Sequence, residues 1–148
     1  MNLIPIEPPG SVDESAGSIP VIASEVIKQS CAVYADTGYE PPWIGYLAFA
    51  NGECVGTCAF KAPPFDGEVE IAYFTFPGSE GKGHATAMTC ELIRIAREAD
   101  PAVAIIAQTL PEENASTAVL KKNGFELEKK FDHIEDGKVW QWRLTLSQ

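Results

Sequence analysis

The chain lacks several features that would define a function class at once. No run of apolar residues approaches the roughly eighteen that a membrane-spanning helix requires. Basic residues are scarce, because 11 Lys and Arg stand against 21 Asp and Glu and give a formal net charge of -10. This balance argues against binding to nucleic acid or to an anionic membrane and would better suit a cationic partner. The first residues also lack the basic region and long apolar stretch of a signal peptide, so we expect a soluble cytoplasmic protein.

Cysteine and histidine are too few to predict a metal centre. The four cysteines lie at positions 31, 54, 58 and 90, and the two histidines lie at 84 and 133. The Cys54–Cys58 pair has no neighbouring histidine to complete a zinc site, so we expect buried free thiols and no metal. With 148 residues and a hydrophobic content of 45%, the chain is long enough for one core, and we predict a single domain over residues 1–148.

The most informative segment is Thr75–Met88, in which an apolar strand runs through glycines into a well-patterned helix. Glycines at 81 and 83 let backbone N–H groups approach an anion, and a helix that begins near Gly83 or His84 adds unpaired N–H donors and its positive dipole end. This geometry suits a phosphate group. The sequence therefore predicts that a phosphorylated cofactor is held by the residues of this turn, namely Gly81, Lys82, Gly83, His84, Ala85 and Thr86.

Two other phosphate-binding motifs fit this segment poorly. A Walker A loop would place Lys and then Ser or Thr after Gly78-x4-Gly83, where His84 and Ala85 stand. The dinucleotide fingerprint would need Gly or Ala in place of Thr86, and a strand near the start of a βαβ unit. A nucleotide-binding domain is therefore a weaker interpretation, and a glycine turn that binds no ligand is the remaining alternative.

Two landmarks of this chain resemble those of one known family. Glu80-Gly81-Lys82-Gly83-His84-Ala85 resembles the pyrophosphate-binding Q/R-x-x-G-x-G/A signature of the GNAT superfamily of acyl-CoA-dependent N-acetyltransferases. Glu80 stands where that family usually has Gln or Arg, and we expect its side chain to point to solvent. Downstream, the Asn-Ala-Ser of residues 114–116 and the Lys-Asn-Gly-Phe of residues 122–125 are similar to the start and exit of another family helix. The resemblance covers about residues 43–146.

The expected order of elements agrees with that resemblance. The patterns predict strands near 3–6, 43–50, 54–60, 69–76, 103–107 and 126–131, a last strand with Trp140 and Trp142 on one face, helices over 21–35, 83–100 and 114–123, and turns at 51–52 and 135–137. The resemblance implies an α/β (α+β) GNAT fold. Such a fold is a twisted, mixed, mostly antiparallel sheet with helices on both faces, splayed at the acyl-CoA site.

The resemblance also implies a reaction. An N-acetyltransferase of this type moves an acetyl group from acetyl-CoA, its co-substrate, to a primary amine by direct attack in a ternary complex. Backbone N–H groups of Tyr73, Phe74 and Thr75 would then face the thioester and the pantetheine. Glu70 lies in a segment similar to the family's Val-Glu-Ile-Gly-Tyr strand and is the candidate base or amine-binding residue. The alternative interpretation is structural, in which the Glu70 carboxylate simply faces an open sheet surface or a neighbouring cation.

Three roles stay open at the level of sequence. Many relatives donate a proton to the thiolate from a tyrosine in the helix after the Asn motif, but residues 114–123 contain none, which leaves Ser116, Tyr73 or a water. Asn114 either lies beside the pantetheine arm, as the resemblance suggests, or simply caps its helix. Four aromatic residues either wall the acceptor cleft or belong to the core, and these are Tyr34, Tyr39, Trp43 and Tyr46.

The acceptor and the assembly are not fixed by the sequence. An acidic cleft would favour a cationic small-molecule or peptide amine, such as a polyamine, an amino sugar, an amino acid or a protein N-terminus. The alternative function is a catalytically silent acyl-CoA-binding sensor or regulatory module, which the carboxylate of Glu80 and the missing helix tyrosine favour. A homodimer could form through the strand with Trp140 and Trp142, or these two residues pack under a helix.

Overall fold

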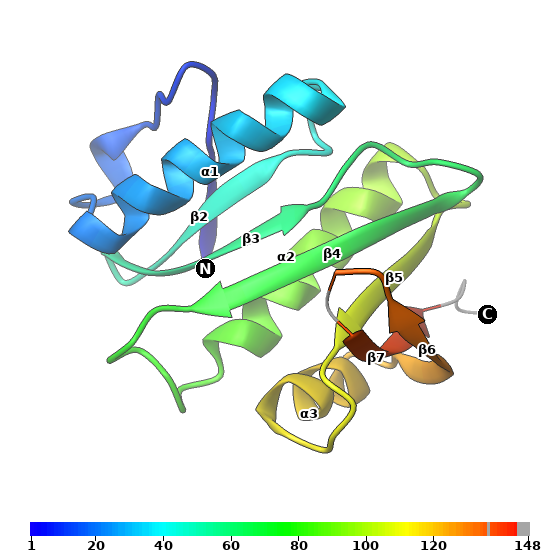
Figure 1. Cartoon of the computed structure of the whole chain (residues 1–148). Coiled ribbons are helices and arrows are strands. Elements are labelled where there is room, and N and C mark those ends of the chain that lie inside the picture. Colours follow the sequence, from blue (N-terminus) through cyan, green and yellow to red (C-terminus); the bar gives the residue numbers. More distant parts are fainter. Residues whose placement is uncertain (136, 145–148) are drawn as a thin grey trace.

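The computed structural model describes residues 1–135 and 137–144 (Figure 1). In chain order its elements are β1 (Asn2–Pro5), a short 3-10 helix (Glu14–Ala16), α1 (Val21–Thr37), β2 (Gly45–Ala50), β3 (Glu53–Phe60), β4 (Glu68–Thr75), α2 (His84–Ala99), β5 (Ala104–Thr109), α3 (Ala115–Lys122), β6 (Glu126–His133) and β7 (Gly137–Leu144). The strands form one seven-stranded sheet in the order β1-β2-β3-β4-β5-β7-β6. β4 and β5 are parallel, and the other neighbouring pairs are antiparallel. The predicted mixed, mostly antiparallel sheet is confirmed.

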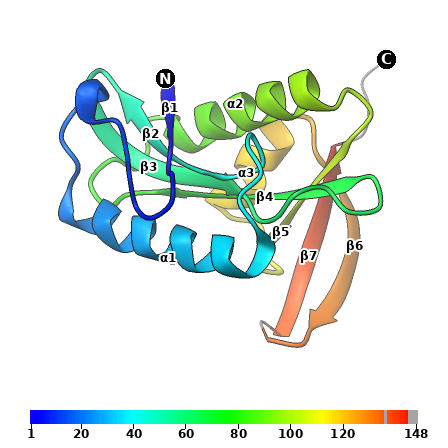
Figure 2. The ribbon, with the colours of Figure 1, turned by 90° about the horizontal axis from the view of Figure 1, so that it is seen from above.

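The helices cover the sheet from both sides. Figure 2 shows α1 on one face and α2 on the other, and α3 packs beside α2. The larger core cluster lies between α2 and the sheet, where Met88, Leu92 and Ile105 have no exposed surface. A second cluster, which includes Ile6 and Phe49, lies toward α1. In the described part of the chain, no helix is both long and apolar enough to cross a membrane.

Local sequence signals explain several elements. Asn51 and Gly52 have φ angles of 51° and 79°, which are the left-handed values that a two-residue turn between β2 and β3 requires. α2 has a buried face that repeats every three or four residues, and it ends at Ala99 as the chain approaches Pro101. Trp142 is only 2% exposed, and its ring centroid lies 6.3 Å from that of Trp140. Trp142 is therefore packed within the fold.

Some boundaries and burial predictions were wrong. β2 begins at Gly45, because the backbone N–H of Trp43 donates to Glu40 in a turn. β6 continues to His133, which is therefore a strand residue, and Asp136 of the predicted turn lies outside the described residues. Of the four cysteines, which are free thiols, Cys54 and Cys58 are buried, Cys31 is half-buried and Cys90 is exposed. Cys90 points outward because it is on the polar face of α2.

The parallel pair of strands separates before either strand ends. β4 and β5 are in register from Glu68 and Ala104 to Ile71 and Ala107. Beyond this point residues 72–75 of β4 still pair with β3, while the end of β5 pairs with β7. The sheet is therefore splayed, and the edge of β4 that faces β5 carries no strand partner over these four residues.

Candidate active site

A groove of about 580 Å³ opens where β4 and β5 separate. Its walls come from the end of β4, from the turn and first residues of α2, and from one side of α3. Nine residues that the sequence assigned to catalysis or cofactor binding line it together, and these are Tyr73, Phe74, Thr75, Gly81, Gly83, His84, Ala85, Thr86 and Ser116. Lys82, Asn114 and Glu70 do not line this groove.

The first turn of α2 directs unpaired N–H groups into the groove. Gly83 is the N-cap residue with φ 82° and ψ 9°, and it provides no side-chain cap. Ala87 is the first helix residue whose N–H bonds within the helix, to the carbonyl of Gly83 at 3.1 Å. Among the described residues, the backbone N–H groups of His84, Ala85 and Thr86 have no acceptor. Together with the helix dipole, they form an anion-binding end.

The two glycines of this turn are required by backbone conformation. Gly81 and Gly83 have φ angles of 77° and 82°, which L residues with a side chain adopt only at a cost. A Cβ atom at either position would meet no other atom within 4 Å in the protein itself. The Cβ positions of both glycines thus face open space, and both residues line the groove.

The charges around the groove differ from the sequence prediction. Lys82 is exposed and does not line the groove, whereas Lys122, in the last turn of α3, does. Lys122 lies three and four residues after Val119 and Ala118, which also line the groove, so helical spacing places the three on one side. Glu80 borders the groove and is exposed, as expected.

Tyr73 of β4 reaches across the opening to α3. Its hydroxyl donates to the backbone carbonyl of Ser116 at 3.0 Å and lies 3.1 Å from the Ser116 hydroxyl. Burial raises the pKa of Tyr73, and the hydrogen bond to Ser116 opposes this shift in part. The tyrosine therefore keeps its proton at neutral pH. The two hydroxyl groups that the sequence offered as proton donors meet at one point of the groove.

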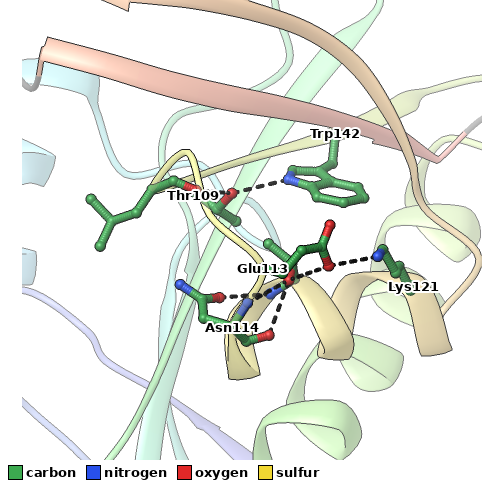
Figure 3. Close-up of polar contacts among 7 residues, drawn as sticks. Thr109, Glu113, Asn114, Lys121 and Trp142 are labelled. Carbon is green, nitrogen blue, oxygen red and sulfur yellow. Dashed lines mark hydrogen bonds and ion pairs between the residues drawn. The ribbon is translucent and has the colours of Figure 1, made fainter.

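α3 is held at its start by a reciprocal cap, shown in Figure 3. The Asn114 side-chain oxygen accepts from the backbone N–H of Thr117 at 3.1 Å, and the Thr117 hydroxyl accepts from the backbone N–H of Asn114 at 2.9 Å. Thr117 and Leu120 are fully buried, whereas Ala115 and Ala118 are exposed toward the groove. The cap role of Asn114 is thus present in the fold.

Further contacts in Figure 3 fix α3 against the sheet. Lys121 pairs with Glu113 at 2.7 Å, and its ammonium lies 5.9 Å from the ring centre of Trp142. The indole N–H of Trp142 donates to the Thr109 hydroxyl at the end of β5, at 3.0 Å. Lys121 thus connects α3 to Trp142 of β7, and Trp142 in turn connects β7 to Thr109 of β5.

Glu70 lies on the other side of β4. Its neighbours Val69 and Ile71 are 2% exposed and face α2, so Glu70 points toward the α1 side of the sheet. The Lys61 ammonium lies 2.9 Å from the Glu70 Oε2 atom, which is buried and has a charged neighbour but no aligned hydrogen bond. Of the two surroundings that the sequence offered for this carboxylate, an open sheet surface or a neighbouring cation, the neighbouring cation is the one observed. Sequence reasoning missed Lys61 because the pairing depends on two different strands meeting.

A second cavity of about 650 Å³ lies between α1 and strands β2 to β4. Phe74 lines both this cavity and the groove, so the two spaces adjoin at the end of β4. Of the four aromatic residues proposed for an acceptor wall, Tyr34 alone lines the cavity. Its hydroxyl is engaged, because it donates to the Ile6 carbonyl and accepts from the N–H of Gly45, each at 2.9 Å.

The other three aromatic residues do not line this cavity, because Tyr46 is buried in the core and Trp43 and Tyr39 are partly buried against it. The Trp43 ring packs edge-on against Phe60 at a centroid distance of 5.1 Å, and the Tyr46 hydroxyl donates to the Pro42 carbonyl at 2.7 Å. Tyr39 packs on Tyr34. Of the two roles that the sequence left open for these aromatic residues, packing with the core is the one seen for Trp43, Tyr46 and Tyr39. In the described residues, no group of His, Cys, Asp and Glu is arranged to hold a metal ion.

Comparison with known proteins agrees with this geometry. The family description "Acetyltransferase (GNAT) domain" matches residues 18–126, which run from before α1 to the start of β6. The chain belongs to the GNAT acetyltransferase domain family and is an acyltransferase. The match includes α1, where the sequence resemblance held only in outline. No curated protein sequence matched the chain.

Several solved structures share the fold. RimL, a ribosomal L7/L12 alpha-N-protein acetyltransferase in complex with coenzyme A, is 20% identical with a TM-score of 0.65 over 84% of this chain and 72% of that chain. The microcin C7 self immunity acetyltransferase MccE, in complex with acetyl-CoA and AMP, is 16% identical with a TM-score of 0.67 over 85% and 72%. An acetyltransferase from Salmonella typhimurium that modifies the N-terminal serine of L7/L12 is 18% identical with a TM-score of 0.64 over 85% and 74%. These similarities confirm the predicted GNAT fold.

Proposed function

We propose that this chain is an N-acetyltransferase that moves an acetyl group from acetyl-CoA to a primary amine by direct attack in a ternary complex. The observation that carries the proposal is the groove at the splayed strands, into which the unpaired N–H groups of α2 open. Solved relatives that contain coenzyme A or acetyl-CoA support the choice of co-substrate.

The groove offers a distinct partner for each part of the cofactor. The amides of residues 81–86 and the ammonium of Lys122 bind the diphosphate. The pantetheine arm lies between β4 and α3, where residues 72–75 have backbone groups without a β5 partner. Those groups bind its amides as an added strand would. In this placement the net charge of -10 matters little, because local amide geometry holds the anion.

The acetyl transfer needs a neutral amine, a stabilised oxyanion and a proton for the departing thiolate. The amine nitrogen forms a bond to the thioester carbonyl carbon, the C–S bond then breaks, and the sulfur takes a proton. We assign this proton to the Tyr73 hydroxyl, which Ser116 orients at 3.0–3.1 Å. We assign the uptake of the amine proton to Glu70, which lines neither the groove nor the second cavity and therefore acts through bridging water molecules. Most of the rate comes from holding both reactants in line.

Two measurements test the proposal in sequence. Acetyl-CoA should raise the melting temperature more than ATP or NAD at equal concentration, because a ligand that binds only the folded state stabilises it. Free thiol should then appear when acetyl-CoA is mixed with members of an amine panel. Stabilisation by a nucleotide but not by coenzyme A would contradict the proposal.

A catalytically silent acyl-CoA sensor is the second candidate. Two observations favour it, namely the ion pair that engages Glu70 with Lys61 and the Glu80 carboxylate at the rim of the groove. A sensor would be stabilised by acetyl-CoA and would release no thiol with any amine. The same pair of measurements therefore separates the two candidates.

A further inference from the structure

The cavity under α1 has a chemical character of its own. Its lining residues, apart from Lys61, come from α1 and from β2 to β4. Figure 2 shows that α1 and α2 cover opposite faces of this sheet. Its volume of about 650 Å³ is within the range of roughly 300–1,000 Å³ typical of small-molecule pockets. Apolar side chains dominate its lining, with Ile22, Val26 and Val33 from α1 and Ala59, Ala72 and Phe74 from the sheet.

The apolar surface stays accessible at the mouth of the cavity. Ile22, Val33 and Phe74 are 37%, 43% and 49% exposed, although each is a large hydrophobic residue. Exposed apolar side chains that border one cavity mark a place where a partner covers them. Because Phe74 also lines the cofactor groove, a molecule in this cavity would reach the end of β4 where we place the thioester.

Negative charge is scarce in this cavity, despite the acidic chain. Glu25 is the one carboxylate among its lining residues, and it lies 3.8 Å from Lys28 with a side chain 69% exposed. Lys61 also lines the cavity and is paired with Glu70 at 2.9 Å. A polyamine or amino sugar would need several carboxylates and would instead meet apolar side chains and an ammonium group. The lining of this cavity is therefore mainly apolar and is not the acidic cleft that the sequence analysis considered.

We infer that the acceptor is a monoamine carried on a compact apolar body, such as a phenylalkylamine or an alkylamine of several carbons. This inference rests on the proposed function, and it names the substrate class of that same site. The apolar body packs between α1 and β4, and the amine points to the end of β4 near Phe74. Glu25 is the one carboxylate among the lining residues, so the cavity offers a counter-charge for one ammonium group and not for several.

The test compares amines at saturating acetyl-CoA by release of thiol. We expect 2-phenylethylamine to exceed spermidine in kcat/KM by at least tenfold. From n-propylamine to n-hexylamine, kcat/KM should rise by up to about fourfold for each added methylene, as for apolar burial. If kcat/KM does not change along the alkylamine series, or is higher for spermidine, the inference is overturned. The proposed acetyltransferase function would still stand.

Two substitutions on α1 form a matched pair. Val33→Glu places a carboxylate at the cavity and should lower kcat/KM for 2-phenylethylamine at least tenfold while raising it for spermidine. Val21→Glu is the control, because Val21 is 88% exposed on the same helix and does not line the cavity. Equal effects of the two substitutions would overturn the inference.

Failure of the transferase proposal can be told apart from failure of this inference. If no amine releases thiol, 2-phenylethylamine is titrated calorimetrically into the protein loaded with coenzyme A. Binding that Val33→Glu weakens and Val21→Glu leaves unchanged would support the apolar site without the reaction. Absence of binding would overturn the site itself.

Discussion

Replacement of Tyr73 by phenylalanine removes one hydroxyl group and leaves the ring in place. In the structure this hydroxyl joins β4 to α3 through Ser116, donating to its carbonyl at 3.0 Å and lying 3.1 Å from its hydroxyl. A hydroxyl has one proton, so the substitution removes one donated hydrogen bond and leaves its partners less well satisfied. We expect the free energy of unfolding to fall by about 1–2 kcal/mol.

The kinetic effect should be larger than the effect on stability. A positioned general acid contributes about 10²–10⁴-fold, so kcat of Tyr73→Phe should fall by about 100-fold or more. The KM for acetyl-CoA should change little, because the diphosphate contacts at α2 are untouched. Ser116→Ala is the control, because the Ser116 carbonyl remains to orient the Tyr73 hydroxyl, and its kcat should fall by much less.

The assay is thiol release at saturating acetyl-CoA, with thermal unfolding measured on the same samples. Burial raises the pKa of Tyr73, so its proton is present at neutral pH and is lost only as the pH rises above the usual value of about 10. Unchanged kcat in Tyr73→Phe, together with the expected loss of stability, would show that the hydroxyl is structural. A larger loss of kcat in Ser116→Ala would instead assign the proton to Ser116.

Four other substitutions test the remaining assignments. Glu80→Gln should tighten coenzyme A binding about two- to fivefold by calorimetry, because it removes an exposed carboxylate from the diphosphate site, and weaker binding would contradict this account. Asn114→Ala should lower the free energy of unfolding by about 1 kcal/mol through loss of the cap, with coenzyme A affinity unchanged; a tenfold loss of affinity would give Asn114 a ligand role. Glu70→Gln should lower turnover and leave acetyl-CoA affinity nearly intact, and unchanged turnover across pH would reject its role as base. Burial raises the pKa of Cys54 from its ordinary value of 9.0 to about 11, so its contribution to stability is present below pH 9 and is lost as the pH rises toward 11. Urea unfolding of Cys54→Ala should show a weaker pH dependence in that range, and an identical dependence would refute this assignment.

The parts of the site that the sequence predicted are those fixed by local backbone geometry. Gly81 and Gly83 could be predicted because a turn into a helix requires positive φ angles, and Asn51-Gly52 could be predicted for the same reason. The start of α3 at Asn114 follows from a capping residue three positions before Thr117. Each of these signals needs only neighbours in the chain.

The features of the site that the sequence did not predict depend on contacts between segments that are distant in the chain. Lys61 meets Glu70 only because β3 and β4 pair, and Tyr73 meets Ser116 only because the sheet splays and α3 closes the opening. The side of α2 that carries Cys90 was misjudged, because an isolated cysteine in an apolar segment does not define the buried face of a helix. Sequence patterns define elements, while the pairing of side chains from different elements needs the assembled fold.

The central claim is that the amides at the start of α2 bind the diphosphate of an acyl-CoA. Calorimetric titration of coenzyme A, beside a titration of pantetheine, tests it most directly, because pantetheine has the same arm without the diphosphate and the adenosine 3′-phosphate. The account predicts one coenzyme A bound per chain and much weaker binding of pantetheine. No binding of coenzyme A, or equal binding of the two, would contradict it.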